Sequence, residues 1–240
     1  MKNFFMLFVI VFIVLTVCLG CFLDYEYEDN DDNLIANTTL GNAYLHGPYG
    51  NVNASNKIAI IVGVHPLENN SHSAVVNFLE KMNQSLNNSY YIYMVNVTKD
   101  SGDFDKSRLN GQIIARDHVV PDINRKNYVL VVDFHAHRGV YEENHFILSP
   151  LNDNTSKSIG LNIIKNIDEL NFLNFTPEDD GHPTSPNYVT IPIINNGTPA
   201  LIYETPIDEP NNLTYGLIGK FILNLDNIRN FRDNNLTLIV

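Results

Sequence analysis

The stretch that most constrains the fold runs from Lys57 to His72 and reads KIAIIVGVHPLENNSH. Its first part, 58–64, is a run of mostly β-branched apolar residues, which is typical of a strand buried on both faces of a parallel sheet. Two polar side chains, His65 and Glu68, follow this run directly, and a helix-compatible apolar pattern comes after them. A strand, a polar turn and a helix therefore meet here, where ligands of open α/β sheets bind.

Two later apolar runs end in the same way. The run 127–134 delivers His135, and the run 198–203 delivers Glu204. The spacing is even, since His135 lies 70 residues after His65 and Glu204 lies 69 residues after His135. Three buried strands thus each end in a potential ligand or base, and imidazole and carboxylate groups are suited to zinc.

The motifs at these strand ends are HPLE at 65–68, DFH at 133–135 and YETP at 203–206. Their order and strand context resemble the zinc carboxypeptidase superfamily, in particular its succinylglutamate desuccinylase and aspartoacylase branch. The resemblance spans about 57–221. It implies an α/β fold, a three-layer sandwich in which helices cover both faces of a mostly parallel mixed sheet.

The same resemblance implies roles for the strand-end residues. His65, Glu68 and His135 would bind one Zn²⁺ per chain and leave a position for water. Glu204 would take the proton of the zinc-bound water as general base and pass it to the leaving amine as general acid. Asp133, two residues before the third ligand, is a candidate outer contact of the site.

The resemblance also implies arginines that stabilise an oxyanion or bind a substrate carboxylate. Arg108 is our choice, because it opens the helix that follows a strand end. Arg116 and Arg125 remain alternatives, since the Asn-Arg dipeptide of the family does not align cleanly. Pro66 replaces the glycine of the family after the first histidine, which should alter the local turn.

One ligand assignment stays open. In the sequence HAH, side chains two apart share a face of a continuing strand, so His137 could take the place of His135. The loop DDGHPTSPNY, with His182 and Tyr188, is a candidate border or lid of the site. The remaining histidines, His46, His72, His118 and His145, are expected to be structural or exposed.

Alternating strands and helices indicate a sheet with helices on both faces. Asn195-Asn196-Gly197 is a tight-turn signal that could join its flanking runs as a hairpin and make the sheet mixed. We expect strands at 57–64, 90–97, 127–134, 188–194 and 199–204, a candidate strand at 145–148, and helices at 71–86, 108–119, 157–170 and 213–227.

The N-terminal 1–23 is expected to be a targeting segment, either a signal peptide or a membrane anchor. Phe4 to Leu23 is 20 residues without a charge, long enough to span a bilayer, and Leu19-Gly20-Cys21 resembles a lipoprotein processing site. We expect an acidic linker at 24–37 and a zinc-hydrolase-like α/β domain at 38–240. Both readings place the chain after Asp24 outside the cytoplasmic membrane, anchored as a lipoprotein or by a helix, or secreted.

Composition agrees with export and excludes some partners. All 27 acidic residues but only 14 of the 15 lysines and arginines follow Leu23, so this part has a formal charge of −13 and is not expected to bind nucleic acid. The only cysteines are Cys18 and Cys21, which leaves no disulfide or thiol nucleophile beyond them. Asn-x-Ser/Thr triplets, which permit glycosylation of an exported protein, begin at Asn37, Asn53, Asn69, Asn83, Asn87, Asn96, Asn154, Asn174, Asn196, Asn212 and Asn235.

Our leading hypothesis is an extracellular, membrane-tethered, zinc-dependent hydrolase of amide bonds in a peptide or an N-acyl amino acid. It would be a carboxypeptidase or a deacylase. The alternative is a non-catalytic surface binding module that keeps a carboxypeptidase-like fold with a structural or degenerate metal site. Glu204 at its strand end favours the enzyme, because a binding module needs no base there.

Overall fold

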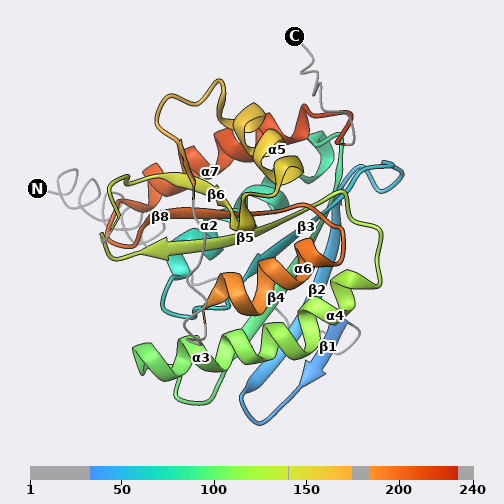
Figure 1. Cartoon of the computed structure of the whole chain (residues 1–240). Helices are drawn as coiled ribbons and strands as arrows, with labels where there is room; N and C mark the ends of the chain where they lie inside the picture. Colours follow the sequence, from blue (N-terminus) through green and yellow to red (C-terminus); the bar gives the residue numbers. More distant parts are fainter. Residues whose placement is uncertain (1–32, 140, 175–183, 232–240) are drawn as a thin grey trace, which may run out of the picture. The chain divides into compact units, whose positions relative to one another are not determined.

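The computed structural model describes residues 33–139, 141–174 and 184–231, which belong to one compact unit (Figure 1). The expected targeting segment, most of the acidic linker and His182 lie outside the described residues. Residues 34–37, which we placed in the linker, form the first strand, β1 (Leu34–Asn37). Within the described part, no helix combines the length and the apolar character that a membrane span needs.

One mixed sheet of eight strands forms the centre of this unit, in the order β1-β2-β4-β3-β5-β8-β6-β7. The central strands β4, β3, β5 and β8 are mutually parallel, whereas β2 and β6 run antiparallel to β4 and β8 on either side. At the edges, β1 pairs antiparallel with β2 and β7 pairs parallel with β6. The other strands are β2 (Gly41–Gly50), β3 (Lys57–Val62), β4 (Ser89–Val97), β5 (Leu130–His137), β6 (Phe146–Ser149), β7 (Asn171–Asn174) and β8 (Ala200–Pro206).

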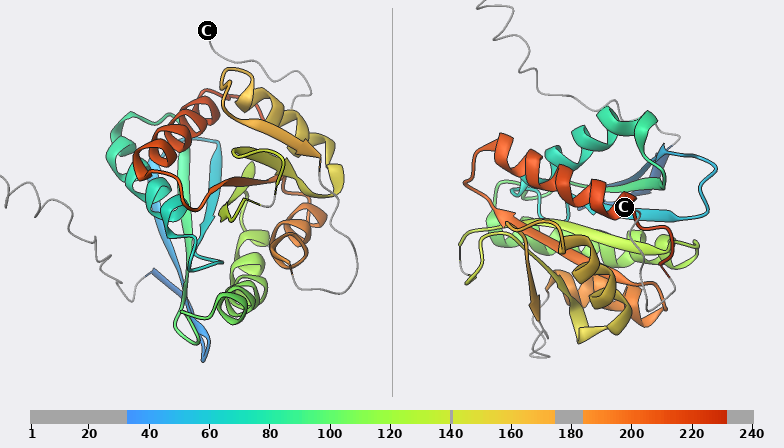
Figure 2. Two further views of the ribbon diagram at one scale, coloured as in Figure 1. Left: turned by 90° about the vertical axis from the view of Figure 1, so that its left-hand side faces the viewer. Right: turned by 90° about the horizontal axis from the view of Figure 1, so that it is seen from above.

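Helices cover both faces of the sheet (Figures 1 and 2). One face carries α2 (Asn69–Met82), α5 (Asn154–Ile164) and α7 (Asn211–Asp226). The other carries α3 (Phe104–Ile114), α4 (Val120–Asn124) and α6 (Ile191–Asn195). The predicted α/β class, with a mostly parallel mixed sheet between two helical layers, is confirmed. Shorter turns of helix are η2 (Asn83–Ser85), η3 (Ala115–Val119), η4 (Pro150–Asn152) and η5 (Pro186–Thr190).

The strands β3, β5 and β8 each carry a buried apolar segment because helices pack on both of their faces. Residues 58–62 of β3, 130–132 of β5 and 200–203 of β8 are all buried. On the α3–α6 side, Ile61 and Val131 share a core with Ile114 and Ile193. Such burial of both faces explains why these strands show no alternation of polar and apolar residues.

One predicted strand is wrong. Residues 188–194 form η5 and α6 rather than a strand, so the expected hairpin at Asn195–Gly197 is a helix-to-strand turn into β8. Pro186 favours the helix, because it lies in the first turn of the helical segment, where a backbone N–H has no intrahelical partner. In a central strand, Pro192 would have removed a ladder hydrogen bond. The antiparallel pairs of the sheet come from β2 and β6 instead.

Candidate metal centre

The turn after β3 presents the first two expected ligands on one side. Glu68 N donates to His65 O over 3.0 Å, which closes a tight turn just before α2 begins at Asn69. Ser71 Oγ donates to Glu68 O over 3.0 Å and secures the first turn of that helix. His65 and Glu68 are almost fully buried despite their polarity, with exposed fractions of 3% and 2%.

The third ligand expected from the sequence comes from the neighbouring strand. His135 lies in β5, which pairs parallel with β3, so both strands end at the same edge of the sheet. Glu68 bridges the two histidines, since its Oε1 lies 3.0 Å from His65 Nδ1 and its Oε2 lies 2.9 Å from His135 Nδ1. Ala136 N also donates to Glu68 Oε2 over 3.0 Å. One ligand atom from each of the three side chains falls within 4.8 Å of the others.

His137 lies outside this cluster. The strand does continue to it, but both of its ring nitrogens are engaged elsewhere. Its Nε2 donates to Asn144 O over 2.8 Å, and its Nδ1 accepts from Gly139 N over 3.0 Å. The ring also stacks on Phe146, with centroids 5.5 Å apart. The geometry therefore groups His135, not His137, with His65 and Glu68.

The far nitrogens of both histidine rings meet polar side chains. His65 Nε2 lies 3.1 Å from Gln112 Nε2, on α3. His135 Nε2 lies 2.9 Å from Asp133 Oδ2 and 3.1 Å from Ser185 Oγ, and Ser185 donates to the same Asp133 oxygen over 2.9 Å. These contacts fix both ring planes and leave Nδ1 of each histidine facing Glu68.

Burial and mutual charge set the protonation of the cluster. Burial lowers the pKa of His65 to about 4, although Glu68 opposes this shift. Burial disfavours ionised Glu68, yet His65 and His135 outweigh it and hold the pKa of Glu68 well below its usual range. Burial likewise opposes protonation of His135, but Asp133 and Glu68 outweigh it and raise its pKa. A metal ion that bound here would displace the proton that His135 holds.

Arg108 contacts the cluster directly. Its NH1 donates to Glu68 Oε1, and the guanidinium lies 5.1 Å from the centroid of the Phe104 ring on the same helix. The other two candidate arginines lie elsewhere, since Arg116 pairs with Asp117 and Arg125 pairs with Asp122. Of these three arginines, Arg108 is thus the one that reaches the site, where it pairs with the carboxylate of Glu68.

Glu204 lies beside the cluster. It is the register partner of His135 across the parallel pair β5–β8, so the two side chains leave the sheet on the same face. Its Oε2 is buried and accepts no hydrogen bond from the described residues. Burial raises the pKa of Glu204 to about 8, against the opposing influence of His135. The side chain of Glu204 is half-buried, and its carboxyl group can hold a proton near neutrality in the metal-free protein.

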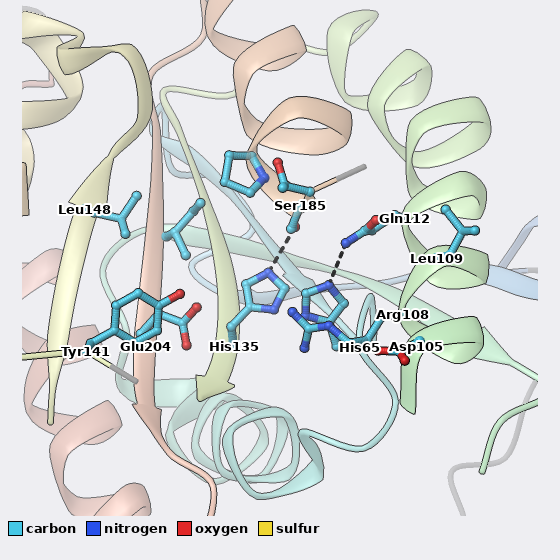
Figure 3. Close-up of a pocket in the computed structure, with 13 residues that line it drawn as sticks. His65, Asp105, Arg108, Leu109, Gln112, His135, Tyr141, Leu148, Ser185 and Glu204 are labelled. Atoms are coloured by element: carbon cyan, nitrogen blue, oxygen red, sulfur yellow. Dashed lines mark hydrogen bonds between the residues drawn. The ribbon is translucent and has the colours of Figure 1, made fainter. Parts of the chain in front are cut away.

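A cavity of about 510 Å³ opens onto His65, His135, Arg108 and Glu204. Figure 3 shows His65, His135 and Glu204 directed into it, with Arg108 and Gln112 on the α3 side and Tyr141 beside Glu204. The remaining wall residues are Asp105, Leu109, Leu148, Thr184, Ser185, Pro186 and Ile202. Tyr188, expected at the border of the site, instead stacks under Arg116, with its ring centroid 4.9 Å from the guanidinium carbon.

Sequence reasoning missed two residues of this site. Gln112 follows Arg108 by four residues, which places both on one face of a helix, so a helical signal for it was present. Ser185 lies just before η5, in the loop that the sequence marked as a candidate border of the site, but no pattern singled out its hydroxyl group. Gln112 on α3 and Ser185 before η5 are far apart in the sequence, so no local pattern could place them in the same site.

The other histidines have separate roles. His72 on α2 is buried, and its Nε2 donates to Phe134 O over 3.1 Å. His145 Nε2 pairs with Glu209 Oε2 over 2.6 Å. His46 is buried beside Tyr44, with ring centroids 6.0 Å apart. None of them joins the group of candidate ligands found among the described residues.

The three clustered side chains fit a zinc ion. They supply two imidazole nitrogens and one carboxylate, the donor set of many catalytic zinc sites, and a cavity opens on the side where a fourth ligand would bind. Polar partners on the far nitrogens support the ring orientation that metal binding through Nδ1 requires. His65, Glu68 and His135 could therefore hold the metal that the sequence predicted.

Comparison with known proteins gives matches by structure alone. No protein-family model matches the sequence, and no curated protein matches it by sequence. Among solved structures, the tripeptide-bound cell shape determinant Csd4 of Helicobacter pylori is 16% identical with a TM-score of 0.49. This match covers 76% of the present chain and 54% of Csd4, so the chain spans about half the length of that protein.

Two further structures are similar at comparable levels. The succinylglutamate desuccinylase/aspartoacylase of Rhodobacter sphaeroides is 13% identical with a TM-score of 0.47, over 77% of this chain and 57% of that one. A metallo-carboxypeptidase of Pseudomonas aeruginosa is 12% identical with a TM-score of 0.45, over 78% and 60%. These are proteins of the kind that the sequence motifs indicated. The function must nevertheless be argued from the site itself.

Proposed function

We propose that the protein is a zinc-dependent hydrolase of amide bonds that acts as a carboxypeptidase or as a deacylase of N-acyl amino acids. One observation supports this above all. The candidate ligands His65 and His135 line a cavity together with Glu204, and Glu68 bridges the two histidines. The Oε2 atom of Glu204 is buried and accepts no hydrogen bond from the described residues. A purely structural metal site has no need of such a group beside it.

Zinc at these ligands would supply a Lewis acid that activates water and polarises the carbonyl to be attacked. Glu204 then handles the proton. Its side chain accepts the proton of the attacking water and returns it to the nitrogen of the leaving amine. In the metal-free protein, burial raises the pKa of this carboxyl group to about 8. A nearby Zn²⁺ would lower this pKa, so that the group is a carboxylate able to accept a proton at neutral pH.

Arg108 and Tyr141 complete the polar wall around the reacting bond. The guanidinium of Arg108 lines the cavity and already binds a carboxylate oxygen, that of Glu68. On binding of the metal to Glu68, Arg108 is the cation available to an oxyanion or to a carboxylate of the substrate. The cavity of about 510 Å³ has room for a short peptide end or an N-acyl amino acid.

We further propose that the domain acts outside the cell, tethered to the membrane by its N-terminal segment or secreted. The uncharged stretch from Phe4 to Leu23 supports this, as does the acidic run that follows it. Peptides and N-acyl amino acids are then the expected substrates, and nucleic acid is not an expected partner of a chain with this acidic balance.

The decisive experiment is Glu204→Gln, which keeps the shape of the side chain and removes its ability to accept a proton. Turnover of peptides and N-acyl amino acids should fall by about 10²–10⁴-fold, while zinc content stays unchanged. Asp105→Asn is the matched control, because this carboxylate lines the same cavity and has no role in the proposal. Pairs of substrates with free and blocked carboxylates would test the role of Arg108.

Wild-type turnover in Glu204→Gln would remove this residue from the mechanism. A zinc-loaded wild-type protein that is inert over a broad panel of amides and peptides would instead favour the non-catalytic binding module.

A further inference from the structure

The described asparagines fall into two groups that differ in exposure. Ten of them begin an Asn-x-Ser/Thr triplet, and all ten are exposed: Asn37, Asn53, Asn69, Asn83, Asn87, Asn96, Asn154, Asn174, Asn196 and Asn212. Among twenty others whose side chains are described, ten are exposed and ten are buried or half-buried. The polarity of asparagine is common to both groups, so it does not explain why only the triplet group is wholly exposed.

We propose that the protein is N-glycosylated at the most open of these triplets. The modification would join the asparagine Nδ2 to the first carbon of an oligosaccharide carried on a lipid phosphate. The bond between this sugar carbon and the phosphate breaks, the amide loses one proton, and the lipid phosphate leaves with the bonding electrons. The acceptor must present both its amide and the hydroxyl of the third residue, because the triplet is read at both positions.

The exposure of the third residue divides nine of these triplets, since Thr176 of the Asn174 triplet lies outside the described residues. In four of them, the hydroxyl side chain is completely buried, at Ser71, Ser89, Ser156 and Thr214. In five, it is exposed or half-buried, at Thr39, Ser55, Ser85, Thr98 and Thr198. Five of the triplets that the structure describes in full are therefore open, and they begin at Asn37, Asn53, Asn83, Asn96 and Asn196.

The five open triplets also differ in the hydrogen bonds that their asparagine side chains form. Asn196 Nδ2 donates to Asn124 O over 3.3 Å, and Asn83 Oδ1 accepts from Gly50 N over 2.7 Å. The side chains of Asn37, Asn53 and Asn96 form no hydrogen bond with other residues that the structure describes. These three have the most accessible acceptor nitrogens.

Two of the three lie in one row across the sheet. Asn37 of β1 pairs with Asn42 of β2, and Asn42 pairs with Asn96 of β4. Directly paired residues share a face, so these side chains project together, with the two acceptors about 10 Å apart across three strands. The middle residue, Asn42, begins no triplet, and its amide donates to Tyr44 OH over 3.1 Å. Asn42 is a built-in control.

The triplets also avoid the chain segment that supplies most of the cavity wall. No triplet begins between 97 and 153, although asparagines occur there. This segment provides seven of the thirteen residues around the cavity, including Arg108, His135 and Tyr141. Glycans on the open triplets would thus leave this segment unmodified.

The inference rests on the proposed export and not on the hydrolase chemistry. Glycosylation and hydrolase activity can therefore be disproved independently. Hydrolase activity can be measured on protein made without glycans. Glycosylation can be measured on inactive Glu204→Gln protein.

The test uses the full chain purified from the membranes of the cells that naturally make it. Mass spectrometry of its peptides should show sugar attached to Asn37, Asn53 and Asn96. Asn37→Gln should remove one glycan from the intact mass, and Thr98→Val should remove the glycan from Asn96 while the acceptor itself remains. Asn42→Gln, in the same row, should change nothing.

Unmodified peptides at all three positions would overturn the proposal. Sugar found only at triplets with a buried hydroxyl, such as those of Asn69 and Asn212, would overturn the assignment to the open sites. A glycan that survives Thr98→Val would show that attachment does not follow the triplet, which also contradicts the proposal.

Discussion

Gln112 and His65 meet side chain to side chain, with Gln112 Nε2 3.1 Å from His65 Nε2. Without metal, His65 Nδ1 donates to Glu68 Oε1, so its Nε2 carries a lone pair that accepts from the glutamine amide. With metal on Nδ1, the proton must move to Nε2, and a half-turn of the amide then presents the glutamine oxygen as acceptor. Gln112 can therefore serve both tautomers of His65.

This relationship predicts opposite effects of two substitutions at Gln112. Gln112→Leu removes the acceptor for Nε2–H and should weaken zinc binding by about 10–100-fold. Gln112→Glu supplies a permanent acceptor and should keep or increase zinc affinity. Isothermal titration with zinc would measure both values, and circular dichroism would check the fold. Equal losses in the two variants would show that the contact is only a matter of packing.

The ligand set itself makes a separate prediction. His65→Ala, Glu68→Ala and His135→Ala should each abolish tight binding of one zinc per chain, because three protein ligands are the minimum for such a site. His118→Ala is the control, since this residue lies outside the cluster of ligand atoms. Metal content by mass spectrometry decides the matter. If His137→Gln loses zinc while His135→Ala keeps it, the assignment of the third ligand is wrong.

Much of the fold could be read from the sequence, because buried parallel strands have a strong signature. The runs that became β3, β5 and β8 are rich in buried apolar residues and end in polar residues. The strands that were missed are of another kind. In β2, exposed and buried residues mix around Gly47 and Pro48, and β7 is only four residues long at the edge of the sheet. β2 and β7 are strands because they pair with neighbouring strands, and a local sequence pattern does not reveal such pairing.

The candidate site divides in the same way. His65, Glu68, His135 and Glu204 could be anticipated because they lie at the ends of three parallel strands, β3, β5 and β8, and parallel strands end at one edge of the sheet. Ser185 could not, since its contact with His135 joins residues 50 positions apart in sequence. That contact depends on how η5 packs over the sheet, and the run that contains η5 was itself taken for a strand.

The helix α3 approaches the turn that carries His65 and Glu68 closely at Gly111. This contact predicts that only glycine fits at position 111. A Cβ built on Gly111 would lie 1.9 Å from Val64 O, directly before His65, and backbone there cannot easily move. Gly111→Ala should therefore lower the free energy of unfolding and weaken zinc binding, because α3 would shift away with Arg108 and Gln112. Chemical denaturation and zinc titration measure the two effects.

Gly216→Ala is the control for that change. Gly216 lies in the interior of α7, and a Cβ there has no atom within 4 Å. Alanine favours helix over glycine, so this variant should be stabilised by up to about 1 kcal/mol. Equal stability of the two variants would contradict the close contact at Val64.

The proposed export predicts the sidedness of the domain. The single charge of Lys2 before the apolar stretch and the acidic run after it favour an external C-terminal domain. Protease added to intact cells should degrade the domain, and a cytoplasmic marker protein should survive the same treatment. Protection until the cells are lysed would overturn the localisation.

The last prediction concerns the dependence of stability on pH. Burial lowers the pKa of His72 from 6.5 to about 4, so the folded protein holds this ring neutral. Between these values the unfolded chain binds a proton that the folded chain does not, and stability must therefore fall as the pH decreases from 6.5 to 4. The loss attributable to His72 is at most about 3 kcal/mol. Well above pH 6.5, neither state is protonated and the contribution of His72 is constant.

His72→Gln isolates this effect, because glutamine does not titrate and keeps an N–H donor for Phe134 O. Urea unfolding of metal-free wild-type and variant proteins at several pH values would give the difference in unfolding free energy. The variant should lose less stability than the wild type between pH 6.5 and 4, and the two curves should be parallel above pH 7. Parallel curves over the whole range would mean that His72 is protonated equally in the folded and unfolded chains, which its burial forbids.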